Sequence, residues 1–384
     1  MTSNMRPLEI YIHIPFCVRK CYYCDFLSAP ADEKTKDAYM EALYTELTKR
    51  AEEFAEYTVV SVFVGGGTPS TVRTKQLVML LDGLRKYYRM DPDAEITVEV
   101  NPGTADKTKL EQYRRAGVNR LSIGLQSGND GELCRIGRIH NFRQFMDTYE
   151  GAVAVGFVNI NVDVMSALPG QTLYSYLETL HMLLALKPQP THISAYSLIL
   201  EEGTRFWELS QEGKLEFPDE DTDRLMYSET GRVLREAGYE RYEISNYAKP
   251  GFRCRHNCGY WTRTDYAGFG IGAASLIDNV RFHNGEQLAS YLKNPTDCRE
   301  DRQVLDSREQ MEEFMFLGLR LTEGIDVRTF GSMFGRSPED VYGEIIEKNK
   351  RNGLLEYREG GNRLALTERG LDISNYVMAQ FLLT

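Results

Sequence analysis

Short apolar segments rich in β-branched residues alternate with amphipathic segments through the first 240 residues of the chain. Six of these segments predict strands, at residues 8–14, 58–64, 95–100, 120–124, 159–165 and 192–198. Amphipathic helices are predicted between them, at residues 32–57, 74–88, 106–116, 142–155 and 172–186. A repeated strand–helix alternation implies a parallel sheet with right-handed crossovers.

The number of repeats indicates the architecture. Eight strand–helix units close a full barrel. Because six are visible here, we predict an α/β fold in the form of a six-unit (βα)6 partial barrel, with a doubly wound open sheet as the alternative. In either architecture, ligands bind at the carboxyl ends of the strands, in the loops that follow them.

The regular alternation stops after a predicted helix at residues 219–237, which Gly238 follows in a favourable C′ position. We therefore expect a barrel at residues 1–238, an accessory segment at 239–306 and a smaller α+β C-terminal domain at 307–384. The last region is predicted to be winged-helix-like, with helices at 310–321, 327–334 and 338–350 and two short strands around a Gly360-Gly361 turn. Residues 321–384 hold eight Lys and Arg against ten Asp and Glu, so a packing or lid role is favoured over nucleic-acid binding.

The net charge of the chain limits the classes of partner that it can bind. The chain has 45 Lys and Arg against 56 Asp and Glu, which gives a net charge of -11 and disfavours attraction to nucleic acid or anionic lipid. No apolar run is long enough to cross a bilayer, and the first residues lack the apolar core of a secretion signal. We expect a cytoplasmic protein with no nucleic-acid partner and no integral membrane segment, so any membrane contact is peripheral.

Three of the seven cysteines lie within eight residues, in the pattern Cys17-x3-Cys21-x2-Cys24 directly after the first predicted strand. In a reducing compartment such a cluster indicates metal or redox chemistry rather than disulfides. Three thiolates on one loop fit a [4Fe-4S] cluster that has one iron open to another ligand. Spacing alone leaves two alternatives open: a zinc site completed by Cys254 or Cys258, and three unrelated thiols.

Polar and glycine residues recur at the ends of the other predicted strands. The second strand leads into Gly65-Gly66-Gly67-Thr68, where glycines allow close approach of a ligand and free N–H groups suit an anion. Four polar side chains occupy comparable places at later strands: Glu99, Gln126, Arg138 and Asp163. Each alone is an ordinary strand-end residue. Together they suit the ribose diol, ammonium group and carboxylate of one ligand.

The Cys-x3-Cys-x2-Cys motif on this repeat resembles that of the radical S-adenosylmethionine (SAM) superfamily. The match is strongest to the branch that holds oxygen-independent coproporphyrinogen III oxidases and HemW-type haem chaperones, and it spans roughly residues 8–200. The resemblance implies that Cys17, Cys21 and Cys24 bind three irons while SAM chelates the fourth. It also implies that the cluster and SAM site is lined by Tyr11, Tyr23, Gly66, Gly67, Thr68, Glu99, Gln126, Arg138 and Asp163.

Two features separate the oxidases from the chaperones. The oxidase motif carries a fourth cysteine two positions after the third, where this chain has Phe26, and the oxidases have a longer N-terminal extension than the sixteen residues before Cys17. The second feature is Arg255-His256-Asn257-Cys258-Gly259-Tyr260-Trp261, whose HNxxYW pattern resembles the chaperone signature.

This HNxxYW segment is the predicted haem site. Imidazole and thiolate are axial ligands of haem iron, and aromatic rings offer flat faces to a porphyrin. We expect His256 as the ligand, with Cys258 and Cys254 as alternatives, beside Asn257, Tyr260 and Trp261. The competing interpretation is a turn between strands whose aromatic residues pack in the core.

The resemblance therefore predicts a haem chaperone that carries a [4Fe-4S] cluster and SAM and passes haem to acceptor haem proteins, with respiratory enzymes as candidates. The enzyme alternative is radical decarboxylation of coproporphyrinogen III to protoporphyrinogen IX. A third class is a zinc-binding interaction protein with a winged-helix end.

Overall fold

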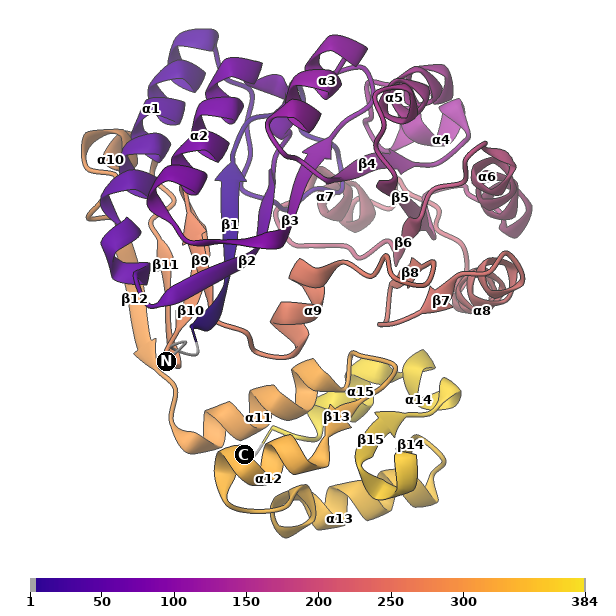
Figure 1. Ribbon diagram of the computed structural model, residues 1–384. Coiled ribbons are helices and arrows are strands. Elements are labelled where there is room, and N and C mark those ends of the chain that lie inside the picture. Colours follow the sequence, from indigo (N-terminus) through magenta and orange to yellow (C-terminus); the bar gives the residue numbers. More distant parts are fainter. Residues whose placement is uncertain (1–4, 383–384) are drawn as a thin grey trace.

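The computed structural model describes residues 5–382 and shows a twelve-stranded sheet with helices on its outer face (Figure 1). Its six central strands run parallel and follow one another across the sheet in chain order. They are β1 (Arg6–Ile14), β2 (Tyr57–Gly66), β3 (Met90–Val100), β4 (Arg120–Gln126), β5 (Asn159–Ser166) and β6 (His192–Ser197). A doubly wound sheet reverses its strand order at a switch point. Since no reversal occurs here, the partial barrel is confirmed and the doubly wound alternative is wrong.

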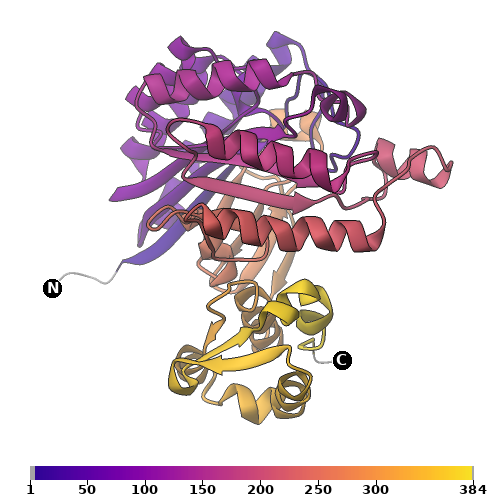
Figure 2. The same cartoon turned by 90° about the vertical axis from the view of Figure 1, so that its right-hand side faces the viewer.

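The predicted helices connect these strands and cover one face of the sheet (Figures 1 and 2). They are α1 (Glu33–Lys49), α2 (Thr74–Tyr87), α3 (Lys107–Arg115), α5 (Phe142–Ala154), α6 (Leu173–Ala185) and α8 (Glu220–Glu236). Three short helices were not predicted: η2 (Pro69–Thr71), α4 (Asp130–Arg135) and α7 (Arg205–Gln211). The short helix η1 (Ala51–Phe54) lies within the helix predicted at 32–57.

Side chains alternate between the two faces of each central strand. In β1, Ile10 and Ile12 are fully buried in the core between sheet and helices. Glu9 and Tyr11 therefore point to the opposite face, which is the barrel interior. The apolar core lies outside the barrel, and this leaves the interior free to carry polar groups.

Residues after 238 extend the same sheet at both edges. The strands β7 (Glu240–Arg241) and β8 (Asn246–Ala248) join the β6 edge, and β9 (Tyr266–Phe269) pairs in parallel with β1. Next to β9 follow β10 (Ala274–Ile277), β11 (Val280–Asn284) and β12 (Arg299–Val304), with helix α10 (Leu288–Lys293). The division at residue 238 stays a prediction.

The C-terminal region has its own sheet and its own hydrophobic cluster. Its strands are β13 (Ile325–Asp326), β14 (Leu355–Arg358) and β15 (Arg363–Leu366), with the turn η3 (Glu359–Gly361). Its helices are α11 (Ser307–Gly318), α12 (Val327–Phe334), α13 (Pro338–Arg351), α14 (Glu368–Asp372) and α15 (Ser374–Ala379). In Figure 1 this unit lies beneath the barrel, beyond helix α9 (Arg255–Trp261).

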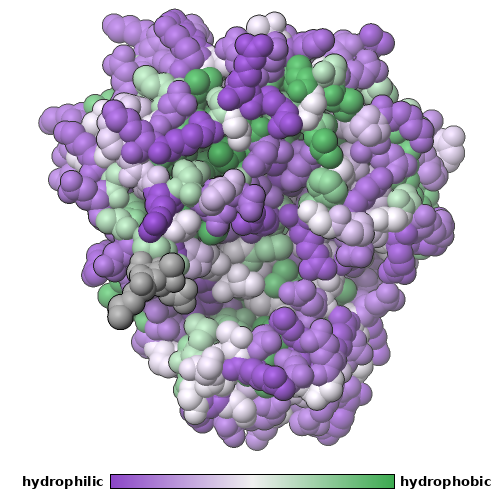
Figure 3. Space-filling model, viewed as in Figure 1, coloured by the Kyte–Doolittle hydropathy of each residue, from purple (hydrophilic) through white to green (hydrophobic). Residues whose placement is uncertain are grey.

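Among residues 5–382, no helix is both long and apolar enough to cross a membrane. The face seen in Figure 3 is mainly hydrophilic, and its hydrophobic residues occur in small groups.

Candidate functional site

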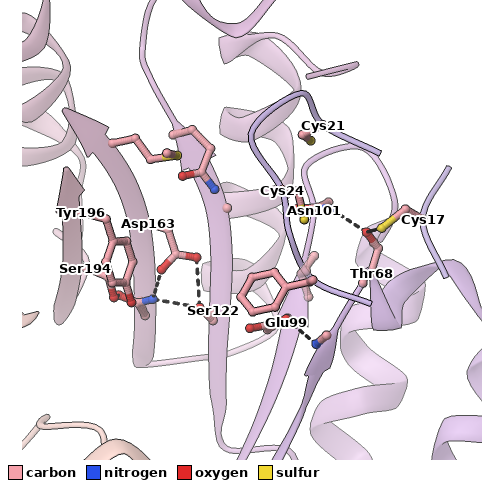
Figure 4. A pocket seen from close by; sticks show the side chains of 18 of the residues that line it. Cys17, Cys21, Cys24, Thr68, Glu99, Asn101, Ser122, Asp163, Ser194 and Tyr196 are labelled. Carbon is pink, nitrogen blue, oxygen red and sulfur yellow. Dashed lines mark hydrogen bonds between the residues drawn. The ribbon is translucent and has the colours of Figure 1, made fainter. Parts of the chain in front are cut away.

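A cavity of about 340 Å³ opens at the carboxyl ends of the central strands, which we call the mouth of the barrel (Figure 4). It reaches inward toward the opposite end, the floor, where α9 lies. The structure brings most of the predicted site residues into this one lining: Cys17, Cys21, Tyr23, Cys24, Gly66, Gly67, Thr68, Glu99, Gln126, Arg138, Asp163 and Asn257.

The three cysteines lie on the loop between β1 and α1, and side chains from other strands donate to two of them. The hydroxyl of Thr68 donates to Cys17 Sγ at 3.6 Å, and the guanidinium of Arg138 donates to Cys21 Sγ at 3.7 Å. Burial, together with the neighbouring thiols, raises the pKa of Cys24 to about 11. Iron binds the thiolate form, so the metal would offset this crowding. Three sulfurs from one loop with donors aimed at them fit a [4Fe-4S] cluster.

A zinc site completed by the distant cysteines does not fit the structure. Cys254 and Cys258 belong to the floor, where the Cys254 thiol donates to Glu95 Oε1 at 3.5 Å. The cysteine loop is at the mouth, at the other end of the strands. In the described part of the chain, no three Cys, His, Asp or Glu side chains converge on a single-ion site.

The glycines after β2 allow close packing instead of exposing free N–H groups. A Cβ at Gly66 would lie 2.5 Å from the His13 ring, and one at Gly67 would lie 2.7 Å from the carbonyl oxygen of Phe16. The N–H of Gly66 donates to Glu99 at 3.1 Å, and that of Gly67 donates to the Ile14 carbonyl at 2.8 Å. The expectation that these N–H groups face an anion is therefore wrong. The first bond ties the end of β2 to Glu99 of β3, and the second ties Gly67 to the end of β1, just before the cysteine loop.

Two carboxyl groups face the cavity from neighbouring parts of the sheet. Burial, and then the charge of Asp163, raise the pKa of Glu99 to about 8. Burial also raises the pKa of Asp163, whose oxygens accept from Asn161 at 2.7 Å and from Ser122 at 3.3 Å. A cation in the cavity would favour the ionised form of both acids.

Arg138 and Gln126 meet at the end of β4. The Arg138 guanidinium donates to Asn101 Oδ1 at 2.9 Å and to the carbonyl of Gly124. Gln126 has a φ of 72°, at a shift in the β4–β5 register. Strain of this kind concentrates at functional sites, where it aims a side chain into the cavity.

Tyr11 is the predicted SAM residue that the structure keeps out of the lining. Its hydroxyl is hydrogen-bonded to His13 Nδ1 at 3.0 Å, and its ring stacks on Phe63 with centroids 6.4 Å apart. Phe63 itself lines the cavity. Tyr11 therefore lies one layer behind the cavity wall.

Other lining residues were missed by the sequence analysis. Most of them are polar. Arg120, Ser122, Asn161, Ser194 and Tyr196 stand at alternate positions of their strands, and Asn101 directly follows β3. Three of the smaller ones surround Asp163 (Figure 4). A period of two within the strands was the signal that could have found them.

Helix α9 carries the HNxxYW segment and fills the floor. His256 is 1% exposed, and its nitrogens are hydrogen-bonded to Ser61 Oγ at 2.8 Å and Tyr260 Oη at 3.0 Å. Burial, then the charge of Arg120, lowers the pKa of His256 to about 3. In this arrangement neither nitrogen is free for iron, and the packing of aromatic residues in the core agrees with the competing interpretation. The segment is a helix and not a turn.

The other residues of α9 divide between two surroundings. Tyr260 packs edge-on against His256 and Tyr266, and Asn257 faces the cavity. The Trp261 ring lies under the guanidinium of Arg320, 4.2 Å away, in the C-terminal region. Burial raises the pKa of Cys258 to about 12 and that of Cys254 further, so both thiols are protonated at neutral pH.

Comparison with known proteins agrees with this site. Residues 11–183 match the radical SAM superfamily, and residues 305–373 match the HemN C-terminal domain. The superfamily match identifies a [4Fe-4S] cluster and SAM as the cofactors of the protein.

A solved structure has the same fold, and curated relatives show the family of the chain. The fold is similar to coproporphyrinogen III oxidase (HemN) from Escherichia coli, with a TM-score of 0.85 at 23% identity over 98% of this chain and 90% of that one. Heme chaperone HemW from Lactococcus lactis is 37% identical, and the alignment covers 98% of each chain. Heme chaperone HemW from Escherichia coli is 36% identical over 99% of each chain. On this similarity the chain belongs to the HemW family of the radical SAM superfamily.

Proposed function

We propose that the protein binds haem and passes it to acceptor haem proteins, while its barrel carries a [4Fe-4S] cluster and SAM. The observation that carries this proposal is the identity of 37% to a curated haem chaperone over 98% of both chains. Acceptors in the respiratory chain and a cytoplasmic site of action complete the proposal.

Cys17, Cys21 and Cys24 are the proposed cluster ligands, and the cavity that they line would hold SAM beside the cluster. The cluster supplies one-electron redox chemistry when bound. Around it, Thr68 and Arg138 donate to the sulfurs, and this stabilises their thiolate form. Glu99 and Asp163 line the same cavity and, once ionised, would offer negative charge to the sulfonium of SAM.

Phe26 favours the chaperone over the oxidase. Its side chain is 62% exposed and lines the cavity, at the position where the oxidase motif has a further cysteine. A phenyl ring supplies no thiol chemistry there. Anaerobic incubation of the cluster-loaded protein with coproporphyrinogen III, SAM and a reductant should therefore yield no protoporphyrinogen IX. Formation of that product would establish the oxidase instead.

The direct test is haem transfer. The cluster-loaded protein is mixed with haem, separated from free haem, and added to an apo-haem protein whose absorbance reports reconstitution. We expect transfer from the wild type. Cys21→Ser should lose iron and sulfide, which tests the cluster ligand separately. No haem retention by the wild type would overturn the proposed function.

Helix α9, which carries the HNxxYW segment, remains the proposed haem site. Haem binding there requires α9 to move out of the floor, so that His256 is exposed. Ser61 Oγ lies 2.8 Å from His256 Nδ1 and holds the ring inside. If release exposes an iron ligand, Ser61→Ala should raise haem affinity, whereas His256→Ala should lower it with cluster absorbance unchanged. Equal haem binding by both variants and the wild type would remove His256 from the haem site and leave it as a core residue.

A further inference from the structure

Arg120 is a buried arginine for which the described part of the chain, residues 5–382, shows no hydrogen-bond or ion-pair partner. It is the first residue of β4, its exposed fraction is 2%, and it lines the inner part of the cavity. Among residues 5–382, its Nε has no hydrogen-bond partner, and no carboxylate lies within ion-pair distance of its guanidinium group. An unpaired buried charge costs several kcal/mol, so such a group is normally satisfied by a counter-ion.

Glu95 and Asp163, whose charges act on Arg120, already accept hydrogen bonds from other donors. Glu95 accepts from the backbone N–H groups of Arg255 and His256, each at 3.2 Å, because its carboxylate anchors the start of α9. Asp163 accepts from Asn161 and Ser122. Both carboxylates act on Arg120 only through their charge. The guanidinium donors therefore remain available to a ligand in the cavity.

The side chains around Arg120 favour a carboxylate as the ligand. A guanidinium group offers a planar fork of donors that matches a carboxylate in a bidentate pair. Asn257 lines the same space, and its side-chain amide could add a hydrogen bond to the carboxylate. Asn161 and Ser194 also line it, but their donors are already used within the protein. Because Glu99 and Asp163 also face the cavity, a dianion such as phosphate would meet more repulsion than a singly charged carboxylate.

We propose that Arg120 forms the base of a carboxylate-binding subsite deep in the barrel, separate from the cysteine loop at the mouth. The carboxylate belongs either to a small free organic acid or to an acidic side arm of the haem cargo. The subsite itself does not depend on the haem proposal, since a free acid tests it in the absence of haem.

The test uses the full-length, cluster-loaded protein with saturating SAM. Because SAM carries a carboxylate of its own, saturation with SAM keeps the probe from binding at the cluster. Propionate is the probe, and propionamide at equal ionic strength is the neutral control. Propionate should raise the melting temperature of the wild type, and propionamide should not. Arg120→Gln should lower propionate affinity at least tenfold in calorimetry. Arg120→Lys keeps the buried charge and the fold but lacks the fork, so it should weaken binding about fivefold.

Two results would overturn the subsite. One is equal propionate affinity in the wild type and both variants. The other is a wild-type response that SAM abolishes, because this would place the carboxylate at the cluster. If Arg120→Gln does not fold, the Arg120→Lys comparison decides alone.

The source of the carboxylate is distinguished by a second comparison, of haem with its dimethyl ester. A preference for haem that disappears in Arg120→Gln assigns the subsite to a side arm of the cargo. A propionate response with no such preference assigns it to a free acid. If the wild type shows neither a propionate response nor a preference for haem over its dimethyl ester, the subsite does not exist.

Discussion

At the residue scale, single glycines decide how closely β2 approaches the cysteine loop. Gly66 combines a φ of 106° with the His13 ring directly against its Cα. The segment lies in the cavity lining as its position after the second strand predicts, but its N–H groups do not face a ligand. Only the packed structure shows that those groups are bonded within the protein, since the acceptors are Glu99 and the strand before the cysteines.

Substitution of Gly66 tests this packing. A positive φ costs an L-residue about 1–2 kcal/mol, and overpacking adds about 1–3 kcal/mol. Gly203→Ala is the matched control, because Gly203 has a φ of 83° and nothing within 4 Å of its added Cβ. In urea unfolding of the cluster-free protein, Gly66→Ala should therefore lose more stability than Gly203→Ala. Equal losses of stability in the two variants would show that the positive φ alone, without the contact with His13, makes glycine necessary at position 66.

The Glu99 carboxyl should make SAM binding depend on pH. Burial and then Asp163 raise its pKa to about 8, so below that pH a proton must leave before the carboxylate can face the SAM cation. The Kd for SAM should therefore rise as the pH falls from 8 to 7, by at most about tenfold per unit. Glu99→Gln should bind SAM more weakly and with a flat profile in calorimetry. A flat wild-type profile would contradict this assignment.

At the element scale, periodicity located the long helices well and the short ones poorly. The helix predicted at 327–334 coincides with α12. The helix predicted at 32–57 ends early, at Lys49, and the amphipathic pattern continues because Ala51 and Phe54 of η1 bury the same face. Helices α4, α7 and α9 have six or seven residues, which is too short for a period of 3.6 to be recognised.

Helix α9 packs against the Glu9 side chain at the floor of the cavity. A Cβ at Gly259 would lie 2.1 Å from this carboxyl group, and Ser61 donates to it at 3.1 Å. Burial raises the pKa of Glu9 to about 9, and Glu95 adds to the shift. The folded protein therefore binds more protons at Glu9 than the unfolded chain between its ordinary pKa and about 9, and stability falls as the pH rises through that window.

Glu9→Gln removes this titration with little change of shape. At pH 5 the variant and the wild type should unfold at similar urea concentrations. At pH 9 the variant should be the more stable, by more than about 1.4 kcal/mol, the free energy of one pKa unit. A stability difference that does not change with pH would show that the Glu9 carboxyl titrates normally.

At the scale of the whole molecule, buried charges attach the C-terminal region to the barrel. Glu313 of α11 pairs with Arg263 at 3.1 Å and with Arg281 at 2.6 Å, and the Arg263 side chain is 3% exposed. Together with Trp261 and Arg320, this contact places α9 between the barrel and the C-terminal region. The region thus supports the floor of the cavity, in line with the expected packing role.

Glu313→Gln should loosen this attachment. Removing one partner of a buried ion pair costs about 3–5 kcal/mol, because the remaining charge stays buried. We expect faster hydrogen exchange in α9 and α11. The control is Glu111→Gln, which breaks an exposed pair with Arg115 and should change stability by less than about 1 kcal/mol. Unchanged exchange in α9 would show that the two parts are held by other contacts.

The sequence by itself determined the six-unit barrel, and it predicted the cysteine cluster and most of the residues that line the cavity. These features are encoded locally, in the period of each segment and in the spacing of a motif after a strand. The tertiary structure decided which residues share the interior. It paired β9 with β1, buried His256 against Ser61 and left Arg120 Nε without a hydrogen-bond partner among the residues that the structure describes. Contacts between residues far apart in the chain leave no periodic trace in the sequence, so only the folded chain reveals them.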